Sequence, residues 1–570
     1  MSEPSSSVKR ALRSQGWFET PELYGWTRQA ALLGMGFQRE SFQGRPVIGI
    51  ANTWSELTHC NAHLRDLAAA VKRGVWQAGG FPLEFPAMSL GEFNMRPTAM
   101  LFRNLLSMEV EELILANPLD GVVLLGGCDK TTPGLLMGAA SADLPAIMVT
   151  GGPQLTAHWR GEELGSCTDC RRYETELRAG RISSADWQEL QTCMVRSPGH
   201  CMTMGTASTM ANLCEALGIA LPMNGAYPAV DSRRSQLAEQ AGRAIVAAVW
   251  NDLRPSRILT LQAFENAIRM LHALGGSTNA IIHLTAIAGR LGIPLPLARF
   301  DQLSDSTPLL VNLKPSGQYL MEDFCYAGGG LALLSELRSL LHLDCMTVTG
   351  RTLGEQLMSA RLDLPDVIRP FAQPLAPDGG LIALRGTLAP SGAVLKRSAA
   401  SPALLHHRGR ALVFDNHEAL LRKIDSPDLD VRPEDVLVMR NAGPLGGPGM
   451  PEWGLLPIPK KLLAQGVRDM VRLSDARMSG TAKGTVIVHV SPESAAGGPL
   501  AAVRSGDWIE LDATQRRLDL LIPPEELARR LATVQNAPPR AERGYRRLYA
   551  EHVQQADAGC DFDFCRAACG

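Results

Sequence analysis

The sequence has almost no excess of charge of either sign. Its 570 residues include 56 Lys and Arg and 58 Asp and Glu, which leaves a net charge of -2. No stretch concentrates Lys and Arg into the basic face that nucleic acids or anionic lipids require. The chain therefore predicts neither a nucleic acid nor a membrane surface as a partner.

Long apolar runs are also missing. Apolar stretches such as residues 135–152 are interrupted by charge before they are long enough to span a bilayer. The first ten residues, MSEPSSSVKR, lack the apolar segment of a secretory signal. These absences predict a cytoplasmic protein with no membrane span.

Cysteine is too sparse for a disulfide scaffold. Twelve cysteines are spread over 570 residues, and a cytoplasmic chain keeps such thiols reduced. Some of them are therefore available to bind metal. Glycine and proline are more frequent, and their short clusters throughout the chain indicate many tight loops around a packed scaffold.

Residues 120–140 give the clearest indication of the fold. A short apolar run meets Gly126 and Gly127, and a helical pattern of small residues follows. This order predicts a buried parallel strand, a loop and a helix, and α/β proteins place ligands in such loops. Further strand patterns occur at residues 47–51 and 146–150, and helical patterns at residues 64–78 and 245–251.

The pattern changes after residues 361–380, which contain four prolines and end on a glycine pair. Beyond this segment, short alternating runs separated by Gly and Pro indicate β-strands. We therefore predict an α/β protein of two domains. Residues 1–375 would form an α/β domain with a central parallel sheet, and residues 376–570 a mainly β, barrel-like domain with a terminal helix at residues 524–534.

Three cysteines lie in segments that we predict to be loops: Cys60, Cys128 and Cys201. Iron-sulfur clusters are bound by thiolates, and an iron without a protein thiolate can bind a substrate oxygen as a Lewis acid. The spacing of these cysteines matches no short ligand motif. From spacing alone, buried inert thiols are an equally good interpretation.

Two other groups of cysteines are more conspicuous. Cys167 and Cys170 form a CxxC pair, but zinc would need a second ligand pair, and the pair follows a polar segment instead of the strand that precedes thioredoxin-like motifs. We predict no function there, with a zinc or thiol protein as an alternative. Cys560, Cys565 and Cys569 crowd the C-terminus, where we expect a frayed tail with incidental thiols in preference to a metal site.

Carboxylates supply a second kind of ligand. Glu92, Asp129 and Glu452 lie in glycine-flanked loops, and their oxygens suit Mg²⁺. Lys130 is ordinarily an ion-pair partner of its neighbour, although a lysine of lowered pKa can be modified or act as a base. Ser479 is ordinarily a turn residue, yet beside a cationic metal site its hydroxyl could lose a proton and act as a base.

Together these segments resemble the dihydroxy-acid and phosphogluconate dehydratase family, and within it the sugar-acid branch of L-arabinonate and D-xylonate dehydratases. The resemblance spans nearly the whole chain and rests on long motifs in the family's order. These motifs are NTWSELTHCNAH, EFNMRPTAMLFRNLLSMEVEE, GGCDKTTP, GHCMTMGTASTM, PAVDSRR, GGSTNA, KPSGQYLMEDF, GGPGMPEWG, SDARMSGTA and HVSPESAAGGP.

The resemblance implies two cofactors and a base. The three loop cysteines would bind a 2Fe-2S cluster, or a 4Fe-4S cluster, with one iron open to substrate. The three carboxylates would bind Mg²⁺, with Lys130 carbamylated as a further oxygen ligand. Ser479, with Thr481 beside it, would take the C2 proton of a sugar acid whose carboxylate and C2 hydroxyl Mg²⁺ holds, while the open iron helps the C3 hydroxyl to leave.

Three positions depart from the family's pattern. His59 stands where proline is usual before the cluster cysteine, and Cys167 stands where glycine is expected. Lys483 occupies a position that is often aromatic in the sugar-acid branch. His59 could tune the cluster and Lys483 could change substrate preference, and an inert substitution is an equal alternative at each position.

The leading hypothesis is a hydro-lyase that dehydrates an aldonate, with a pentonate such as L-arabinonate or D-xylonate ahead of hexonates. It would act as a homodimer or homotetramer on this small-molecule partner. One alternative is the dihydroxy-acid dehydratase of branched-chain amino-acid synthesis. Another is a non-catalytic iron-sulfur sensor, which would not need the carboxylates, Lys130 or Ser479.

Overall fold

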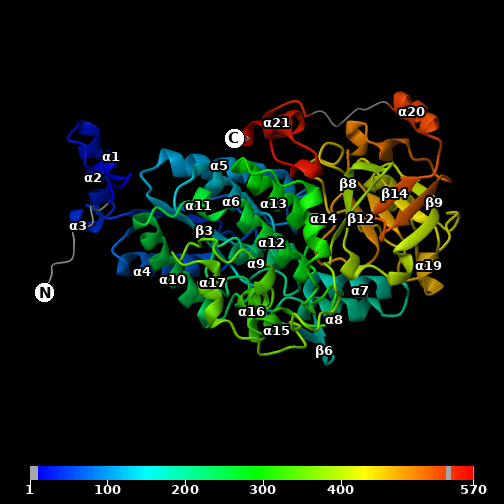
Figure 1. Ribbon diagram of the computed structural model, residues 1–570, viewed down its shortest axis with the longest axis horizontal. Helices are drawn as coiled ribbons and strands as arrows, with labels where there is room; N and C mark the ends of the chain where they lie inside the picture. Colours follow the sequence, from blue (N-terminus) through cyan, green and yellow to red (C-terminus); the bar gives the residue numbers. More distant parts are fainter. Residues whose placement is uncertain (1–9, 535–540, 569–570) are drawn as a thin grey trace.

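The computed structural model describes residues 10–534 and 541–568. Figure 1 shows a large part built of helices around a parallel sheet, with a β-barrel at one end of the molecule. This arrangement confirms the predicted fold class. No helix in the described ranges is long and apolar enough to cross a membrane.

The parallel sheet is the centre of the helical part. Its four strands run in the order β2-β1-β3-β4, and every neighbouring pair is parallel. β1, β3 and β4 are buried along their whole length, as expected for apolar runs covered on both faces. The strands are β1 (Val47–Asn52), β2 (Phe81–Pro86), β3 (Gly121–Gly126) and β4 (Ala146–Thr150).

Helices cover the sheet at close range. Where α4 and α10 cross, a Cβ atom on Gly74 would lie 1.9 Å from the carbonyl oxygen of Glu239, and one on Gly242 would lie 2.3 Å from that of Val71. Glycine at both positions therefore allows the two backbones to touch. The helices against the sheet are α4 (Leu64–Gln77), α6 (Thr131–Ala142) and α10 (Ser232–Trp250), and α5 (Arg103–Ala116) packs against α6.

A second group of helices forms the interior between the sheet and the barrel. α13 is buried along its whole length, which is typical of a helix in the core of a large protein. This group includes α9 (Thr206–Ala216), α12 (Leu261–Ala273), α13 (Asn279–Arg290), α14 (Leu297–Asp305) and α16 (Gly329–Glu336).

The barrel closes in the strand order β10-β11-β12-β8-β7-β14-β13-β9. Its apolar side chains form a core of their own, because residues along each strand of a closed sheet point alternately to the inside and to the outside. The strands are β7 (Ile382–Gly386), β8 (Ala389–Leu395), β9 (His406–Phe414), β10 (Val436–Met439), β11 (Arg472–Ser474), β12 (Val486–Ser491), β13 (Trp508–Asp512) and β14 (Arg517–Leu520).

The remaining elements lie around these two cores. They are α1 (Gln15–Phe18), α2 (Leu23–Gly34), α3 (Arg39–Phe42), β5 (Ala157–Trp159), β6 (Glu162–Leu164), α7 (Ser166–Arg178), α8 (Ser184–Cys193), α11 (Pro255–Ile258), α15 (Met321–Tyr326), α17 (Leu353–Gln356), α18 (His417–Lys423) and α19 (Lys460–Ala464).

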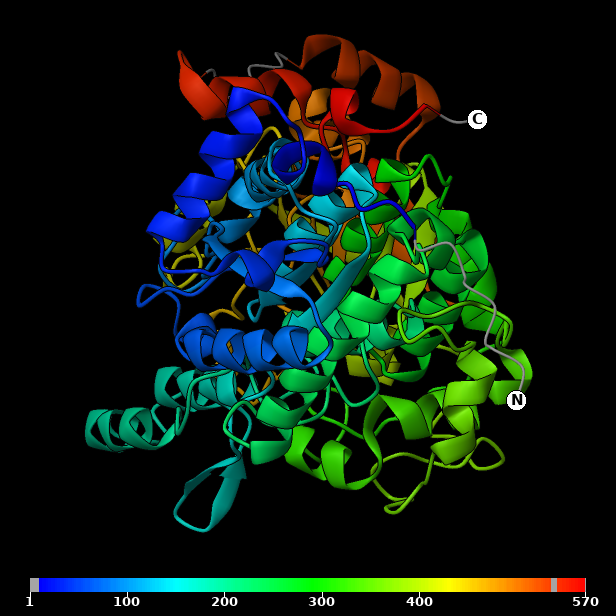
Figure 2. The ribbon, with the colours of Figure 1, turned by 90° about the vertical axis from the view of Figure 1, so that its left-hand side faces the viewer.

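The C-terminal segment corrects one expectation. The predicted terminal helix is present as α20 (Pro524–Thr533), but α21 (Gly544–His552) follows it, and both lie along one side of the molecule (Figures 1 and 2). Beyond α21, Asp561 is buried in an ion pair with Arg290 at 2.7 Å. The expectation of a frayed tail is therefore wrong for Cys560, which is buried, and for Cys565, which packs against an apolar cluster. Cys569 lies outside the described residues.

Candidate active site

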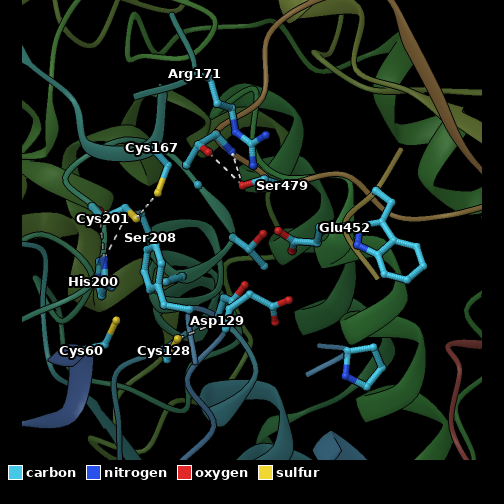
Figure 3. Close-up of a pocket in the computed structure, with 18 of the residues that line it drawn as sticks. Cys60, Cys128, Asp129, Cys167, Arg171, His200, Cys201, Ser208, Glu452 and Ser479 are labelled. Carbon is cyan, nitrogen blue, oxygen red and sulfur yellow. Dashed lines mark hydrogen bonds between the residues drawn. The ribbon is translucent and has the colours of Figure 1, made fainter. Parts of the chain in front are cut away.

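A cavity of about 670 Å³ lies where the barrel meets the helical part. This volume is within the usual range for small-molecule sites. Figure 3 shows thiols, carboxylates and hydroxyls facing one space. Of the residues singled out in the sequence, the cavity is lined by Cys60, Cys128, Cys167, Cys201, Glu92, Asp129, Glu452, Ser479 and Thr481.

The parallel sheet explains how distant ligands meet. Cys60, in the short helix η1 (His59–Asn61), follows β1, and Glu92 follows β2. Cys128 and Asp129 follow β3 directly. Because parallel strands end at one edge of a sheet, the loops after them converge on the same place.

Two of the thiols have a raised pKa. A hydrogen bond with Cys128 and burial raise the pKa of Cys60. A hydrogen bond with Cys167 and burial raise the pKa of Cys201. Binding to a metal removes such protons and compensates the buried charge that results. The donor set therefore suits a soft iron-sulfur centre.

As the side chains are placed in the described ranges, no three His, Cys, Asp or Glu residues converge on one point as the ligands of a single metal ion would, and this holds for the thiols and for the carboxylates around Lys130 alike. The placement of Cys167 and Cys170 opposes the alternative of a zinc site that both would share, because Cys167 lines the cavity whereas Cys170 packs against an apolar cluster. A cluster with bridging sulfides does not require three thiolates around one point. The spread of the thiols is compatible with such a cluster.

The position of Cys167 corrects a second expectation. The CxxC pair opens helix α7 directly after strand β6, with only Gly165 between them. The strand was missed because β6 is a mostly exposed, acidic segment, Glu-Glu-Leu. Cys167 lines the cavity, and its Sγ lies 3.7 Å from Sγ of Cys201. Cys170 instead packs against an apolar cluster.

Three carboxylates surround the buried ammonium group of Lys130. Its Nζ lies 2.5 Å from Asp129, 3.1 Å from Glu452 and 3.4 Å from Glu92. Burial alone would lower the pKa of Lys130, but the three carboxylates outweigh it and raise the pKa. The three carboxylates thus surround one cation, the ammonium group of Lys130. Their oxygens are also the kind of ligand that suits Mg²⁺.

Side chains that the sequence did not single out hold these carboxylates in place. Arg477 and Asn279 each donate a hydrogen bond of 2.9 Å to Oε1 of Glu452. Arg477 also donates to Thr98, whose hydroxyl donates to Glu92 at 2.7 Å. Both Arg477 and Asn279 lie within family motifs, SDARMSGTA and GGSTNA, which was the available signal.

Ser479 occupies the loop between β11 and β12 and is partly exposed to the cavity. Its Oγ lies 2.8 Å from Oγ1 of Thr481. The carbonyl of Thr481 accepts a hydrogen bond of 3.0 Å from Thr168 of α7. Helix α7 therefore fixes the loop that presents Ser479.

Arg171 is a second residue of α7 that sequence reasoning missed. It lines the cavity, and Figure 3 shows its guanidinium group directed toward the region of Ser479. Its Nε is buried and lacks a hydrogen-bond partner in the described part of the chain. An unsatisfied buried guanidinium nitrogen is costly, so this group is available to an anion or hydroxyl in the cavity.

Two other departures from the family's pattern have different surroundings. His59 lies 3.6 Å from Sγ of Cys60 through its Nε2, and it also packs against Phe93. It therefore contacts a thiol of the cavity directly. Lys483 is exposed and lies outside the residues that line the cavity, which favours an inert substitution there.

Comparison with known families covers most of the chain. Residues 45–356 match the model described as dihydroxy-acid/6-phosphogluconate dehydratase N-terminal. Residues 366–560 match the model described as dihydroxy-acid/6-phosphogluconate dehydratase C-terminal. The cavity is lined by residues from both matched segments.

Individual relatives match over nearly their whole length. An L-arabonate dehydratase of Azospirillum brasilense is 54% identical, with 98% of this chain and 97% of the relative covered. A 6-deoxy-6-sulfo-D-gluconate dehydratase of Pseudomonas putida is 50% identical, with 100% and 98% covered. A dihydroxy-acid dehydratase of Caldicellulosiruptor bescii is 41% identical, with 92% and 96% covered.

Proposed function

Because the chain belongs to the dihydroxy-acid/6-phosphogluconate dehydratase family, we propose that it converts an aldonate to the 2-keto-3-deoxy acid by removing water. A pentonate such as L-arabinonate or D-xylonate is the leading substrate. The observation that carries this proposal is that several thiols, several carboxylates and Ser479 line one cavity.

The relatives and the cavity wall favour a sugar acid over a branched-chain dihydroxy acid. The two relatives named for sugar acids are 54% and 50% identical, against 41% for the dihydroxy-acid dehydratase. The wall also offers hydrogen-bonding groups, among them Arg171, Thr206 and Ser208. A site that satisfies several substrate hydroxyls discriminates strongly against an alkyl analogue.

In this proposal Cys60, Cys128 and Cys201 hold a 2Fe-2S cluster, with a 4Fe-4S cluster as the alternative. The carboxylates around Lys130 hold Mg²⁺. When bound, the two cofactors supply Lewis acids, the iron for the departing C3 hydroxyl and Mg²⁺ for the substrate carboxylate and C2 hydroxyl.

Carbamylation of Lys130 is part of the same proposal. The carboxylates raise the pKa of Lys130 and favour its ammonium form, so the amine would lose a proton only when Mg²⁺ takes over their charge. The neutral amine would then add CO₂ and release a second proton, which leaves an anionic carbamate among Glu92, Asp129 and Glu452. Such a concentration of buried negative charge requires a divalent cation. Modification of the lysine and occupancy by Mg²⁺ would therefore support each other.

The chain's own residues then move the proton and orient the substrate. Ser479 takes the C2 proton, with Thr481 Oγ1 at 2.8 Å to hold its hydroxyl in position. The positive charge of Arg171 favours the deprotonated form of that hydroxyl. The departing C3 hydroxyl would take up the proton that Ser479 received, so that water is released and an enol remains, which tautomerises to the keto acid. We place this reaction in a cytoplasmic homodimer or homotetramer.

Two substitutions test the division of roles. Ser479→Ala should keep the visible absorption of the cluster and lose about 10²- to 10⁴-fold in kcat, the usual contribution of a general base. Cys128→Ser should lose both absorption and turnover. Anaerobic spectra and keto-acid assays of both variants measure this difference, and a bleached cluster in Ser479→Ala would contradict the assignment.

A further inference from the structure

Four sulfur atoms, not three, face the thiol side of the cavity. Cys60 and Cys128 lie close enough for Cys128 to raise the pKa of Cys60, and the sulfurs of Cys167 and Cys201 lie 3.7 Å apart. Figure 3 shows the two pairs on opposite sides of the same space. The proposed ligand set uses both members of the first pair but only Cys201 of the second.

The spacing of the second pair suits a shared metal. Two thiolates on one tetrahedral metal, each about 2.3 Å away, lie about 3.8 Å apart. The sulfurs of Cys167 and Cys201 already lie 3.7 Å apart. They need almost no movement to bind one iron together, whereas a disulfide would require them to approach to about 2.05 Å.

The fold also fixes the direction of Cys167. Gly165 donates its backbone N–H to Asp169 at 2.6 Å, and Thr168 donates to the carbonyl of Thr481. These two bonds fix the start of α7 on both sides of Cys167: the first lies within the start of the helix, and the second joins the helix to the loop that carries Ser479. Since Cys167 itself lines the cavity, its place there is a property of the helix start and not of a free loop.

We propose that Cys167 is a fourth thiolate ligand of the cluster, so that each iron of a 2Fe-2S centre carries one of the two cysteine pairs. This inference rests on the proposed function. A 2Fe-2S cluster commonly takes four cysteine thiolates. In the resting enzyme Cys167 occupies the position that the substrate hydroxyl takes during turnover.

Substrate binding is then a ligand exchange. The bond from iron to Cys167 would break with its electron pair staying on sulfur, and a lone pair of the substrate oxygen would form the new bond to iron, so that no electron is transferred. Cys167 remains beside Cys201, ready to return when the product leaves. The resting cluster is thereby shielded from solvent at its otherwise open iron.

Mössbauer spectra of protein loaded with ⁵⁷Fe under anaerobic conditions test this proposal. Wild-type protein without substrate should show both irons in equivalent all-sulfur sites, as one doublet. Cys167→Gly and Cys167→Ser should each show a second doublet from about half of the iron, because one iron loses a sulfur ligand. Cys170→Ala is the matched control, three residues along α7, and should match wild type.

Adding substrate to the wild-type protein should produce the second doublet as well. Identical spectra for wild type and Cys167→Gly would overturn the inference, and so would a mass loss of two hydrogens from a disulfide between Cys167 and Cys201 in the loaded protein. The proposed function fails separately, by an absence of cluster or of keto acid from every variant. An active enzyme with two doublets in the wild type would reject only the role of Cys167.

Discussion

At the scale of single residues, Arg171 lines the cavity with part of its hydrogen-bonding capacity unused. Its Nε is buried without a partner in the described residues. Burial by itself raises the pKa of Glu452, but the positive charges of Lys130, Arg477 and Arg171 together lower it. A hydroxyl or carboxylate oxygen of the substrate would complete the guanidinium's hydrogen bonds.

Replacing Arg171 should therefore impair substrate use without removing the cofactors. We expect Arg171→Met to lower kcat/KM by about 10- to 100-fold, the usual worth of a hydrogen bond to a charged group. Arg171→Lys should recover part of the loss, because the charge returns without the fork of donors. Steady-state kinetics with cluster absorption as a reference measure both variants.

The neighbouring Arg172 provides the control for this prediction. It is half exposed and pairs with Glu162 and Asp169 on the outer side of α7. Arg172→Met should leave kcat/KM close to wild type. Equal losses in the two arginine variants would show that the helix, and not the cavity contact, is responsible.

The candidate ligands were predictable at this scale because each lies in a long motif. The side chains that orient them were not. Asn279 and Arg477 also lie in motifs, but they reach Glu452 only after α13 and the barrel loop come together, so the motifs alone do not show which groups they contact. The contact between Cys167 and Cys201 could not be predicted either, since 34 residues separate them in the sequence.

At the scale of elements, the end of strand β8 places a lysine in the interior of the protein. Lys396 follows the strand, is fully buried, and its Nζ has no hydrogen-bond partner in the part of the chain that the structure describes. Burial lowers the pKa of Lys396 from 10.5 to about 7. Between these two values the unfolded chain binds this proton and the folded chain does not.

Stability should therefore rise with pH across that window. Each pH unit contributes up to about 1.4 kcal/mol to the free energy of unfolding while only the unfolded state carries the proton. Lys396→Met should remove this contribution and be more stable than wild type near neutral pH. Urea midpoints at about pH 7.5 and about pH 9 compare the two proteins.

Lys423→Met is the control, since Lys423 is exposed at the end of α18. It should keep the pH dependence of the wild type. If Lys396→Met shows the same rise of stability with pH as wild type, the buried amine is not its cause.

The elements themselves were predicted unevenly. The buried runs of β1, β3 and β4 and the helix α4 are found within a residue or two of the predicted ranges, because burial on both faces leaves a continuous apolar pattern. β8, which reads Ala-Pro-Ser-Gly-Ala-Val-Leu, contains the turn residues proline and glycine. β6 is acidic and exposed. Such strands are specified by their partners and not by their own pattern.

At the scale of the whole molecule, the site exists only where two parts of the chain meet. Lys130 pairs with Glu452, 322 residues away, at 3.1 Å. Arg477 spans the same boundary to Thr98 at 3.1 Å. A sequence pattern can identify each side of such a contact, but the distance between them is a property of the assembled fold.

The central claim is that this assembled cavity dehydrates sugar acids. Anaerobically purified protein with Mg²⁺ should be assayed for 2-keto acid formation from a panel of C5 and C6 aldonates, with 2,3-dihydroxyisovalerate alongside. We predict keto acid from the aldonates, with a pentonate the best substrate. Preference for 2,3-dihydroxyisovalerate would move the protein to the branched-chain alternative, and no keto acid from any of these compounds would contradict the dehydratase account itself.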